Sequence, residues 1–153
     1  ALPMIQWRNS ESGFGWVGRI LHWTGVALVI AIYIGISGLD APPKVYERDV
    51  VIATHNIMGW SLLGLILVRL TWRLRSANPV LGWRLSKGHE RLVVTVHRAL
   101  YVIVIATCVS GWLATEQTAV SLHDRLAMGL LLLLAAHATL ALINMLVASV
   151  DDR

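Results

Sequence analysis

The sequence predicts an all-α integral membrane protein, a bundle of four transmembrane helices. Hydrophobic residues make up 56% of its 153 residues, and the mean hydropathy is +0.65. Charged residues make up 14%, against about 25% in a typical soluble domain. The apolar residues are also grouped into long runs. A chain this short cannot bury so much apolar surface in a core surrounded by water, so the bilayer is its natural solvent.

Each apolar run has the length of a membrane-spanning helix. Four stretches without charge hold 20, 19, 17 and 25 residues, at 20–39, 50–68, 99–115 and 126–150. A hydrocarbon core of about 30 Å needs about 20 helical residues. In lipid, only α-helices and closed β-barrels pair all of their backbone polar groups. Polar and apolar residues do not alternate strictly in any of these runs, as they would in a barrel strand. The predicted spans are 18–38, 51–72, 93–114 and 123–148, within one domain covering residues 1–153.

Turn residues and tryptophans mark the ends of these spans. Pro42 and Pro43 prevent the first helix from continuing through a turn at Asp40–Pro43. The basic segment 73–91 reads as an exposed loop. Four tryptophans are placed as interfacial anchors: Trp16, Trp72, Trp83 and Trp112.

A glycine pattern precedes the first span. The letters GFGWVG at 13–18 match G-x-G-x-x-G, which indicates dinucleotide binding only after a strand in a βαβ unit. Here a membrane helix follows. The glycines are therefore expected to ease helix packing.

The charge pattern predicts the orientation. Alternating helices put ten basic residues on the side of both termini and three on the other side. The ten are Arg8, Arg19, Arg69, Arg73, Arg75, Arg84, Lys87, Arg91, Arg98 and Arg153; the three are Lys44, Arg48 and Arg125. The positive-inside rule then predicts that this side, with the N- and C-termini, is cytoplasmic. This asymmetry explains the net charge of +4 without a nucleic-acid partner.

The histidines carry the chemistry. Of six, five lie in or at the ends of spans: His22, His55, His97, His123 and His137. His89 is expected to be a solvated loop residue. Ionisable groups in a membrane are costly and usually functional, although a single one often only bonds to a neighbouring helix. Five in one small bundle favour a functional set.

Their spacing predicts sites at two depths. His22 begins the first span on the inner side, and His55 lies near the outer end of the second. His137 follows His123 by 14 residues, which is about 21 Å along a helix and within about 40° of the same direction. Two bis-histidine sites, one above the other, would follow.

Flat porphyrins suit such paired imidazoles better than zinc, which prefers a compact tetrahedral set. Small residues on the same faces would let a ring approach: Gly25, Gly59, Ala127 and Ala141. They serve close helix packing equally well. Arg19, Arg98 and Arg125 could pair with haem propionates. Alternatively, these long side chains only extend to the membrane interface. The only cysteine is Cys108 and C-x-x-C-H is absent, so any haem would be non-covalent.

Four segments resemble the bacterial cytochrome b561 family and, more distantly, the dihaem cytochrome b subunits of membrane-bound hydrogenases and formate dehydrogenases. They are RILHW at 19–23, THNIMGW at 54–60, HRALY at 97–101 and LHDRLAMGLLLLLAAH at 122–137. The resemblance implies two b haems, with the fourth helix giving one ligand to each. It pairs His22 with His137 on the inner side and His55 with His123 on the outer side.

Depth alone leaves the inner pair open, because His97 begins the third span at about the level of His22. The family pattern favours His137. His97 would then lie beside the inner haem or a quinone site, as a proton carrier.

Two imidazoles on each iron leave no open position, so such haems pass electrons. We interpret the chain as a dihaem cytochrome that moves electrons across the membrane. The resemblance implies that it exchanges these electrons with the quinone pool, so that ubiquinone would bind to it in addition to the haems. Some family members oxidise superoxide and reduce ubiquinone. Here the outer face has five acids against three basic residues, which suits an anionic substrate poorly and a basic cytochrome c better. Two alternatives remain. The chain could be the membrane anchor of a larger oxidoreductase, or a haem-free bundle that is structural or conducts protons. The sequence also leaves open whether the protein is a simple electron carrier or a quinone-linked oxidoreductase.

Overall fold

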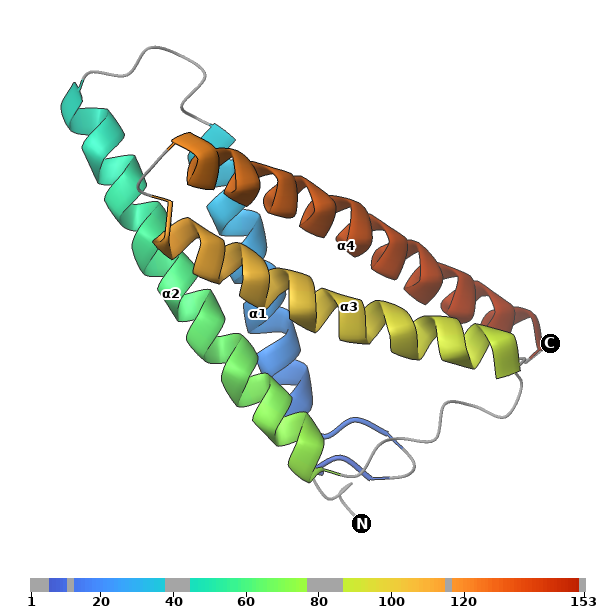
Figure 1. Cartoon of the computed structure of the whole chain (residues 1–153). Coiled ribbons are helices and arrows are strands. Elements are labelled where there is room, and N and C mark those ends of the chain that lie inside the picture. Colours follow the sequence, from blue (N-terminus) through green and yellow to red (C-terminus); the bar gives the residue numbers. More distant parts are fainter. Residues whose placement is uncertain (1–5, 11–12, 38–44, 77–86, 115–116, 152–153) are drawn as a thin grey trace. The chain divides into compact units, whose positions relative to one another are not determined.

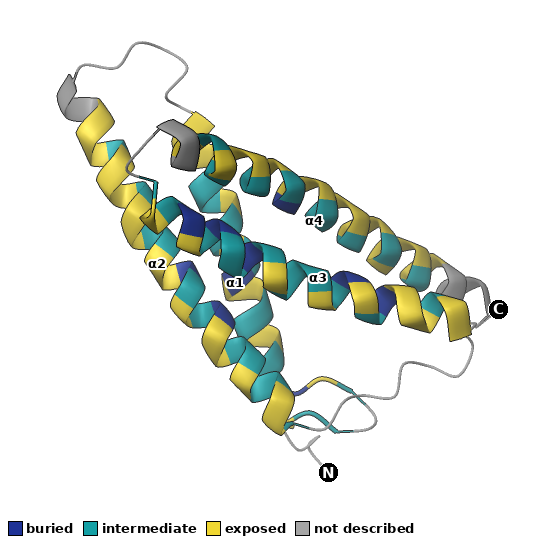
Figure 2. Ribbon diagram, viewed as in Figure 1, coloured by how far each residue is buried: buried dark blue, intermediate teal, exposed yellow. Residues whose placement is uncertain are grey.

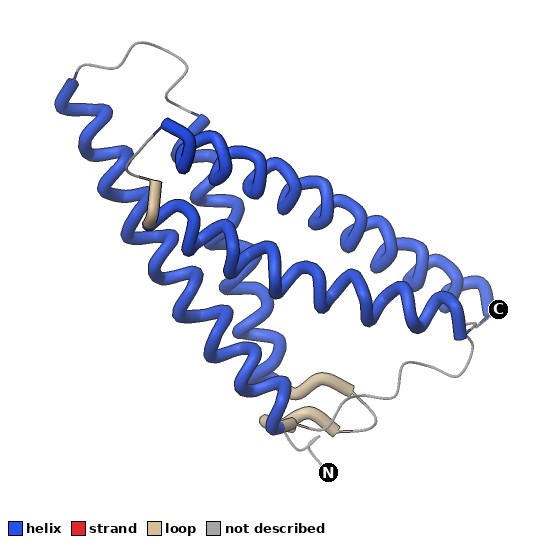
Figure 3. The backbone as a smooth tube through the Cα atoms, in the orientation of Figure 1, coloured by secondary structure: helices blue, strands red, loops and turns tan. Residues whose placement is uncertain are grey.

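The chain forms four α-helices in the part that the structure describes (Figures 1 and 3). The structure is a computed structural model that describes residues 6–10, 13–37, 45–76, 87–114 and 117–151, with side chains except at 45–47, 117–119 and 147–151. The helices are α1 (Trp16–Ser37), α2 (Val45–Arg75), α3 (Lys87–Trp112) and α4 (Gln117–Asp151). Each is long and apolar enough to cross a membrane. The all-α, four-helix membrane fold is thus confirmed. The expected turn at Asp40–Pro43 and the anchor Trp83 lie outside the described residues.

Three of the helices are longer than the spans expected from charge. α2 begins at Val45 and not near 51, and α3 begins at Lys87 and not near 93. Because α2 also continues to Arg75, both ends of the segment expected as a loop at 73–91 are helical. Charged residues mark the edge of the hydrocarbon, but they do not end a helix there. Their long side chains reach the interface while the backbone remains helical.

The chain divides into two compact units, Ala1–Val80 and Leu81–Arg153, and each holds an antiparallel helical hairpin. In the α1–α2 hairpin, Leu62 and Ile66 of α2 are buried. Gly25 of α1 is buried as well, and a Cβ built on it would lie 3.8 Å from Leu65 Cδ2. Gly25 therefore lies in the contact between the two helices, where small residues are common in membrane helix pairs, although a Cβ would make only an ordinary contact there.

The α3–α4 hairpin is packed in the same way. Val93, Val96 and Val104 of α3 and Leu130 of α4 are buried. A Cβ on Gly129 of α4 would lie 3.1 Å from Ile103 Cδ1 of α3. That contact is tighter than ordinary packing, so a side chain at 129 would require the end of Ile103 to shift slightly.

Large apolar side chains are exposed along every helix (Figure 2). Ile34 in α1, Leu67 in α2, Val102 in α3 and Leu132 in α4 are between 47% and 69% exposed. In water this would be costly, since burying apolar surface stabilises by about 25 cal/mol per Å². In a bilayer, apolar side chains can contact lipid or a neighbouring helix without this cost, which agrees with four membrane-spanning helices.

The segment before α1 folds back over the start of that helix. The Trp16 N–H donates to the Gln6 carbonyl at 2.9 Å, and the Val17 N–H donates to the Trp7 carbonyl at 3.4 Å. The first N–H groups of a helix have no partner within it. Here carbonyls of the preceding chain accept from them.

The glycines before α1 make this folding back possible. The Gly15 N–H donates to Asn9 Oδ1 at 3.0 Å. A Cβ on Gly15 would lie only 2.6 Å from the Trp7 carbonyl oxygen, and one on Gly18 would lie 3.0 Å from Asn9 Oδ1. The expectation of helix packing is therefore wrong for Gly15 and Gly18, because their neighbours belong to the chain's own N-terminal segment.

Candidate functional site

The two histidines of the α1–α2 hairpin lie toward its opposite ends. His22 is six residues after the start of α1, and His55 is 20 residues before the end of α2, distances of about 9 Å and 30 Å along the helices. Because the hairpin is antiparallel, Trp16 and Arg75 lie at the same end of it. Both rings are half-buried, and their Nδ1 atoms are inaccessible to solvent. The hairpin therefore presents imidazoles at two depths.

His123 of α4 is held against α3 by hydrogen bonds. Its Nδ1 lies 3.0 Å from the Thr107 carbonyl oxygen and 3.2 Å from Ser110 Oγ. A carbonyl oxygen only accepts, so Nδ1 carries the proton. The Ser110 hydroxyl donates to the Thr107 carbonyl at 2.9 Å and turns a lone pair toward Nδ1.

This arrangement fixes the tautomer of His123. With the proton on Nδ1, Nε2 is the unprotonated nitrogen, which is the atom that an iron or another metal would bind. The ring also lies directly on Gly111, because a Cβ there would be 2.9 Å from Cε1 and 3.1 Å from Nδ1. Three residues on one face of α3 thus orient the imidazole.

His97 and His137 meet within the α3–α4 hairpin. Their ring centroids are 4.7 Å apart and the rings are nearly perpendicular, at 83°. His97 Nδ1 donates to the Val93 carbonyl oxygen at 2.7 Å, which again leaves Nε2 unprotonated. The two residues that compete in sequence for the inner position therefore lie at the same depth of this hairpin.

The glycines expected beside the histidines have different surroundings. Gly25 lies in the contact between α1 and α2, against Leu65. At Gly59, a Cβ would meet nothing within 4 Å. Gly25 therefore serves helix packing in the hairpin, whereas Gly59 leaves open space on the face of His55. A role of either glycine beside a haem stays a prediction.

The arginines expected near haem propionates are exposed. Arg19 lies in the first turns of α1, Arg98 next to His97 in α3, and Arg125 two residues after His123 in α4. Each is thus close along its helix to one of the histidines. Their contact with propionates stays a prediction.

Residues 13–150 match the protein family described as prokaryotic cytochrome b561. The chain belongs to this family. It is therefore a membrane b-type cytochrome of electron transfer, and its cofactor is haem b. No curated protein and no solved structure matches the chain.

The residues of this cytochrome fit a b haem. A haem iron accepts imidazole nitrogens, and the geometry leaves Nε2 of His123 and of His97 as the unprotonated nitrogen. The open space beside Gly59 would admit a flat ring on the face of His55. Among the described residues no three His, Cys, Asp or Glu side chains gather as a tetrahedral metal site requires. The donor set suits paired imidazoles.

His89 differs from what the sequence suggested for it. It lies in the first turn of α3, is half-buried, and its Nε2 is 2.6 Å from Asn144 Oδ1 of α4. The interpretation as a solvated loop histidine is wrong, because α3 begins six residues earlier than charge indicated. The ring joins the ends of the two helices of this cytochrome.

Sequence reasoning missed Thr107, Ser110 and Gly111, which orient His123. Their spacing in the sequence indicates a shared role, because positions i, i+3 and i+4 lie on one face of a helix. The polar pair Thr107 and Ser110 is buried within an apolar span, where a buried polar group needs a partner. The Ser110 hydroxyl and the Thr107 carbonyl lie within hydrogen-bond distance of His123 Nδ1 on the next helix, whereas the Thr107 hydroxyl donates to the Ile103 carbonyl.

Proposed function

We propose that this cytochrome holds two b haems and carries electrons between the two sides of the inner membrane, exchanging them with the quinone pool. The observation that carries the proposal is the presence of imidazoles at two depths in each hairpin. His22 and His55 lie toward opposite ends of α1–α2, and His123 and His137 are 14 residues apart in α4.

The proposed ligand pairs follow the family pattern. His22 and His137 would hold the inner haem, and His55 and His123 the outer one. The orientation of His123 supports this role, because Thr107 and Ser110 fix its proton on Nδ1. His97 contacts His137 at 4.7 Å between ring centroids, and the alternative inner pair is His22 with His97.

A b haem held by two imidazoles supplies one-electron transfer and leaves no coordination site for a further ligand. The chain's own residues position the rings and exclude water around them. His97, held to the Val93 carbonyl through Nδ1–H, keeps a basic Nε2 beside His137. We propose that this nitrogen accepts a proton when a quinol is oxidised at the inner side.

Reduction by a quinol analogue tests the proposal. We expect the purified protein to be reduced in detergent within the time of mixing, and carbon monoxide to leave the reduced spectrum almost unchanged, because both axial positions are filled. The His97→Ala variant should retain its haem and react more slowly with quinol. Unchanged quinol kinetics in that variant would leave His97 as a packing residue, and no reduction of the unaltered protein would exclude quinone exchange.

We also propose that both termini are cytoplasmic. The end of the α1–α2 hairpin where α1 begins carries far more basic residues than its other end, where Arg48 lies. The same holds for the α3–α4 hairpin, in which Arg125 lies opposite the basic end. The basic residues are Arg8, Arg19, Arg69, Arg73 and Arg75 in the first hairpin and Lys87, Arg91 and Arg98 in the second. Each hairpin alone thus supports the same orientation.

Cysteine labelling in whole cells checks the orientation. In a Cys108→Ser background, a membrane-impermeant reagent should label Val45→Cys in intact cells, because α2 begins on the periplasmic side. Ser86→Cys should be labelled only after permeabilisation. The Cys108→Ser chain without a new cysteine is the matched control for background labelling. The opposite labelling pattern would invert the orientation and exchange the inner and outer haems.

The proposed partner on the periplasmic side is a basic soluble electron carrier such as a cytochrome c. Asp49 of α2 and Asp124 of α4 are exposed at the ends of the hairpins opposite the basic ends. Opposite charge on a partner would raise its rate of association. Superoxide, an anion, is not favoured by these carboxylates.

A further inference from the structure

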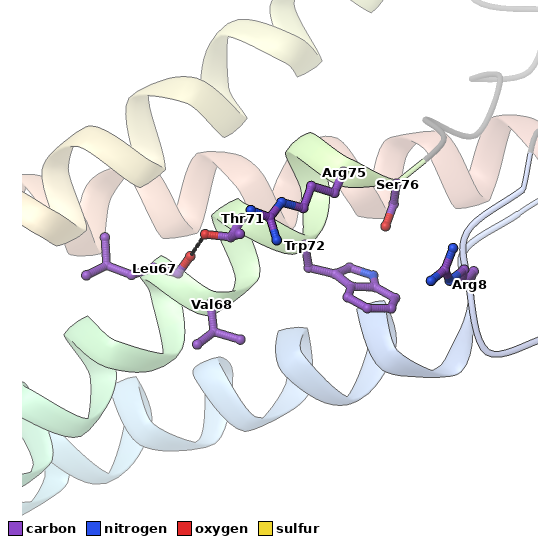
Figure 4. A pocket seen from close by; sticks show the side chains of 7 residues that line it. All are labelled: Arg8, Leu67, Val68, Thr71, Trp72, Arg75 and Ser76. Carbon is purple, nitrogen blue, oxygen red and sulfur yellow. Dashed lines mark hydrogen bonds between the residues drawn. The ribbon is translucent and has the colours of Figure 1, made fainter.

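A cavity of about 620 Å³ lies beside the last turns of α2 and the segment that precedes α1 (Figure 4). Leu67 and Val68 line its apolar part, and both are about half exposed. Arg8, Trp72 and Arg75 line the remainder. Its volume is in the range of small-molecule sites in proteins, about 300–1,000 Å³.

The cavity is on the face of α2 that points away from the histidine. At 100° per residue, Leu67, Thr71 and Arg75 lie roughly 120°, 160° and 200° around the helix from His55. Leu62 and Ile66, which are buried, lie within roughly 20° of the direction of His55. This wall of the cavity therefore lies on the side of α2 opposite His55, whereas Trp72, which also lines the cavity, lies roughly 100° around the helix from His55.

Both arginines of the cavity are exposed and lack a nearby carboxylate among the described side chains. In the described part of the α1–α2 hairpin the acidic side chain is Asp49, at the other end of α2. It is 26 residues from Arg75, or about 39 Å along the helix. Arg8 and Arg75 thus place two positive charges beside an apolar surface with no described counter-charge.

Trp72 provides a hydrogen-bond donor between these parts. Its indole lies below α2 on the side of the segment that carries Arg8 (Figure 4). The Nε1–H is buried and has no hydrogen-bond partner in the described part of the chain. The neighbouring Thr71 hydroxyl, by contrast, already donates to the Leu67 carbonyl at 2.9 Å. A buried indole N–H needs an acceptor oxygen, and a ligand in the cavity can supply one.

We propose that this cavity binds one anionic phospholipid of the leaflet at the basic end of the hairpin. Arg8 and Arg75 attract the phosphate from two sides of the cavity, the Trp72 N–H donates to a phosphate or ester oxygen, and an acyl chain lies along Leu67 and Val68. Guanidinium groups match phosphate oxygens in geometry and charge. Tryptophan is the residue that places an N–H at the level of the head groups while its ring remains in apolar surroundings.

A quinone head group fits the cavity less well. It would accept a bond from the indole, but it is uncharged and gives no reason for two arginines. The cavity also begins 12 residues, or about 18 Å, along α2 from His55. Charge complementarity therefore favours the lipid.

Native mass spectrometry of the haem-loaded full chain tests the site. The protein is titrated with phosphatidylglycerol or with phosphatidylcholine in mild detergent. We expect one phosphatidylglycerol to bind more tightly than the zwitterionic lipid. The Arg8→Gln/Arg75→Gln variant should bind it roughly tenfold more weakly, as expected for two lost charges near the membrane surface. Trp72→Phe, which retains the ring and removes the N–H, should weaken binding by a smaller factor.

Matched variants separate the site from general charge. Arg48→Gln/Arg91→Gln removes two exposed arginines elsewhere and should bind as the unaltered protein does. Arg8→Lys/Arg75→Lys preserves the charge but not the guanidinium geometry, so its affinity should lie between those of the unaltered protein and the glutamine pair; it also serves if the glutamine pair loses its haem spectrum. Equal affinity in the glutamine pair and the unaltered protein would overturn the proposal. Displacement of the lipid by inorganic phosphate alone, or by a quinone analogue, would overturn it too.

Discussion

Replacing His123 by alanine is expected to lower the haem content from about two per chain to about one, and His137→Ala should remove the other haem. The two histidines are 14 residues apart in α4, so one substitution cannot reach both sites, which are about 21 Å apart in depth. Pyridine haemochrome assays give the haem content. Redox titration should show one surviving component in each variant, with a different midpoint potential in the two.

The matched control is His89→Ala. This histidine is half-buried and bonds to Asn144, but it lies in the first turn of α3 and is not a proposed ligand. Both haems should be retained. If His97→Ala removes the inner haem and His137→Ala retains it, the inner pair is His22 with His97. Loss of both haems in every histidine variant, His89→Ala included, would contradict separate sites.

The Gly111→Val substitution is expected to remove the outer haem almost as completely as His123→Ala. A Cβ at this position would already be 2.9 Å from His123 Cε1, and valine adds two methyl groups beyond it. The ring must turn away, which breaks its bonds to the Thr107 carbonyl and Ser110. Forcing extra carbons into a packed contact costs about 1–3 kcal/mol. Haem content and the midpoint potential of the outer component are the measurements.

Two alanine variants separate loss of the ligand from general destabilisation. Gly111→Ala should shift the midpoint of the outer haem and lower its content partially. Gly129→Ala introduces the same methyl group into the same hairpin, where a Cβ would be 3.1 Å from Ile103 Cδ1, and should retain both haems. If the two variants lose haem equally, Gly111 acts through stability and has no specific effect on His123.

Four helices could be predicted from the sequence because lipid permits few backbone arrangements. Every peptide group must be paired within the span, so a charge-free run of sufficient length indicates a helix. The helices α2 and α3 begin six residues before the spans expected from charge, for a related reason. Charge reports where the hydrocarbon ends, and the helices continue past Arg48 and Arg91 into the interface. The error at His89 follows directly from this displaced boundary.

The surroundings of the histidines were harder to predict than the histidines themselves. Imidazoles in apolar runs are conspicuous, because their burial is costly without a function. Their partners lie on other helices, as His137 does for His97 and Thr107 for His123. A single sequence shows which residues share a face of one helix, but it does not show which face is turned toward a neighbouring helix. Which face of α3 meets α4 follows from packing, and packing is determined by contacts such as Gly129 with Ile103.

The fold of the N-terminal segment over α1 has an electrostatic consequence. The start of a helix carries partial positive charge and free N–H groups, and for that reason it often binds phosphate. Here the N–H groups of Gly15, Trp16 and Val17 already donate to Asn9, Gln6 and Trp7. Because these three amides of the glycine-rich segment 13–18 already donate within the chain, they cannot also hold a nucleotide phosphate. At this end of the hairpin, anions are therefore attracted by arginine side chains. Unlike the amides of a helix end, which are fixed in place, these side chains can move together with a lipid head group.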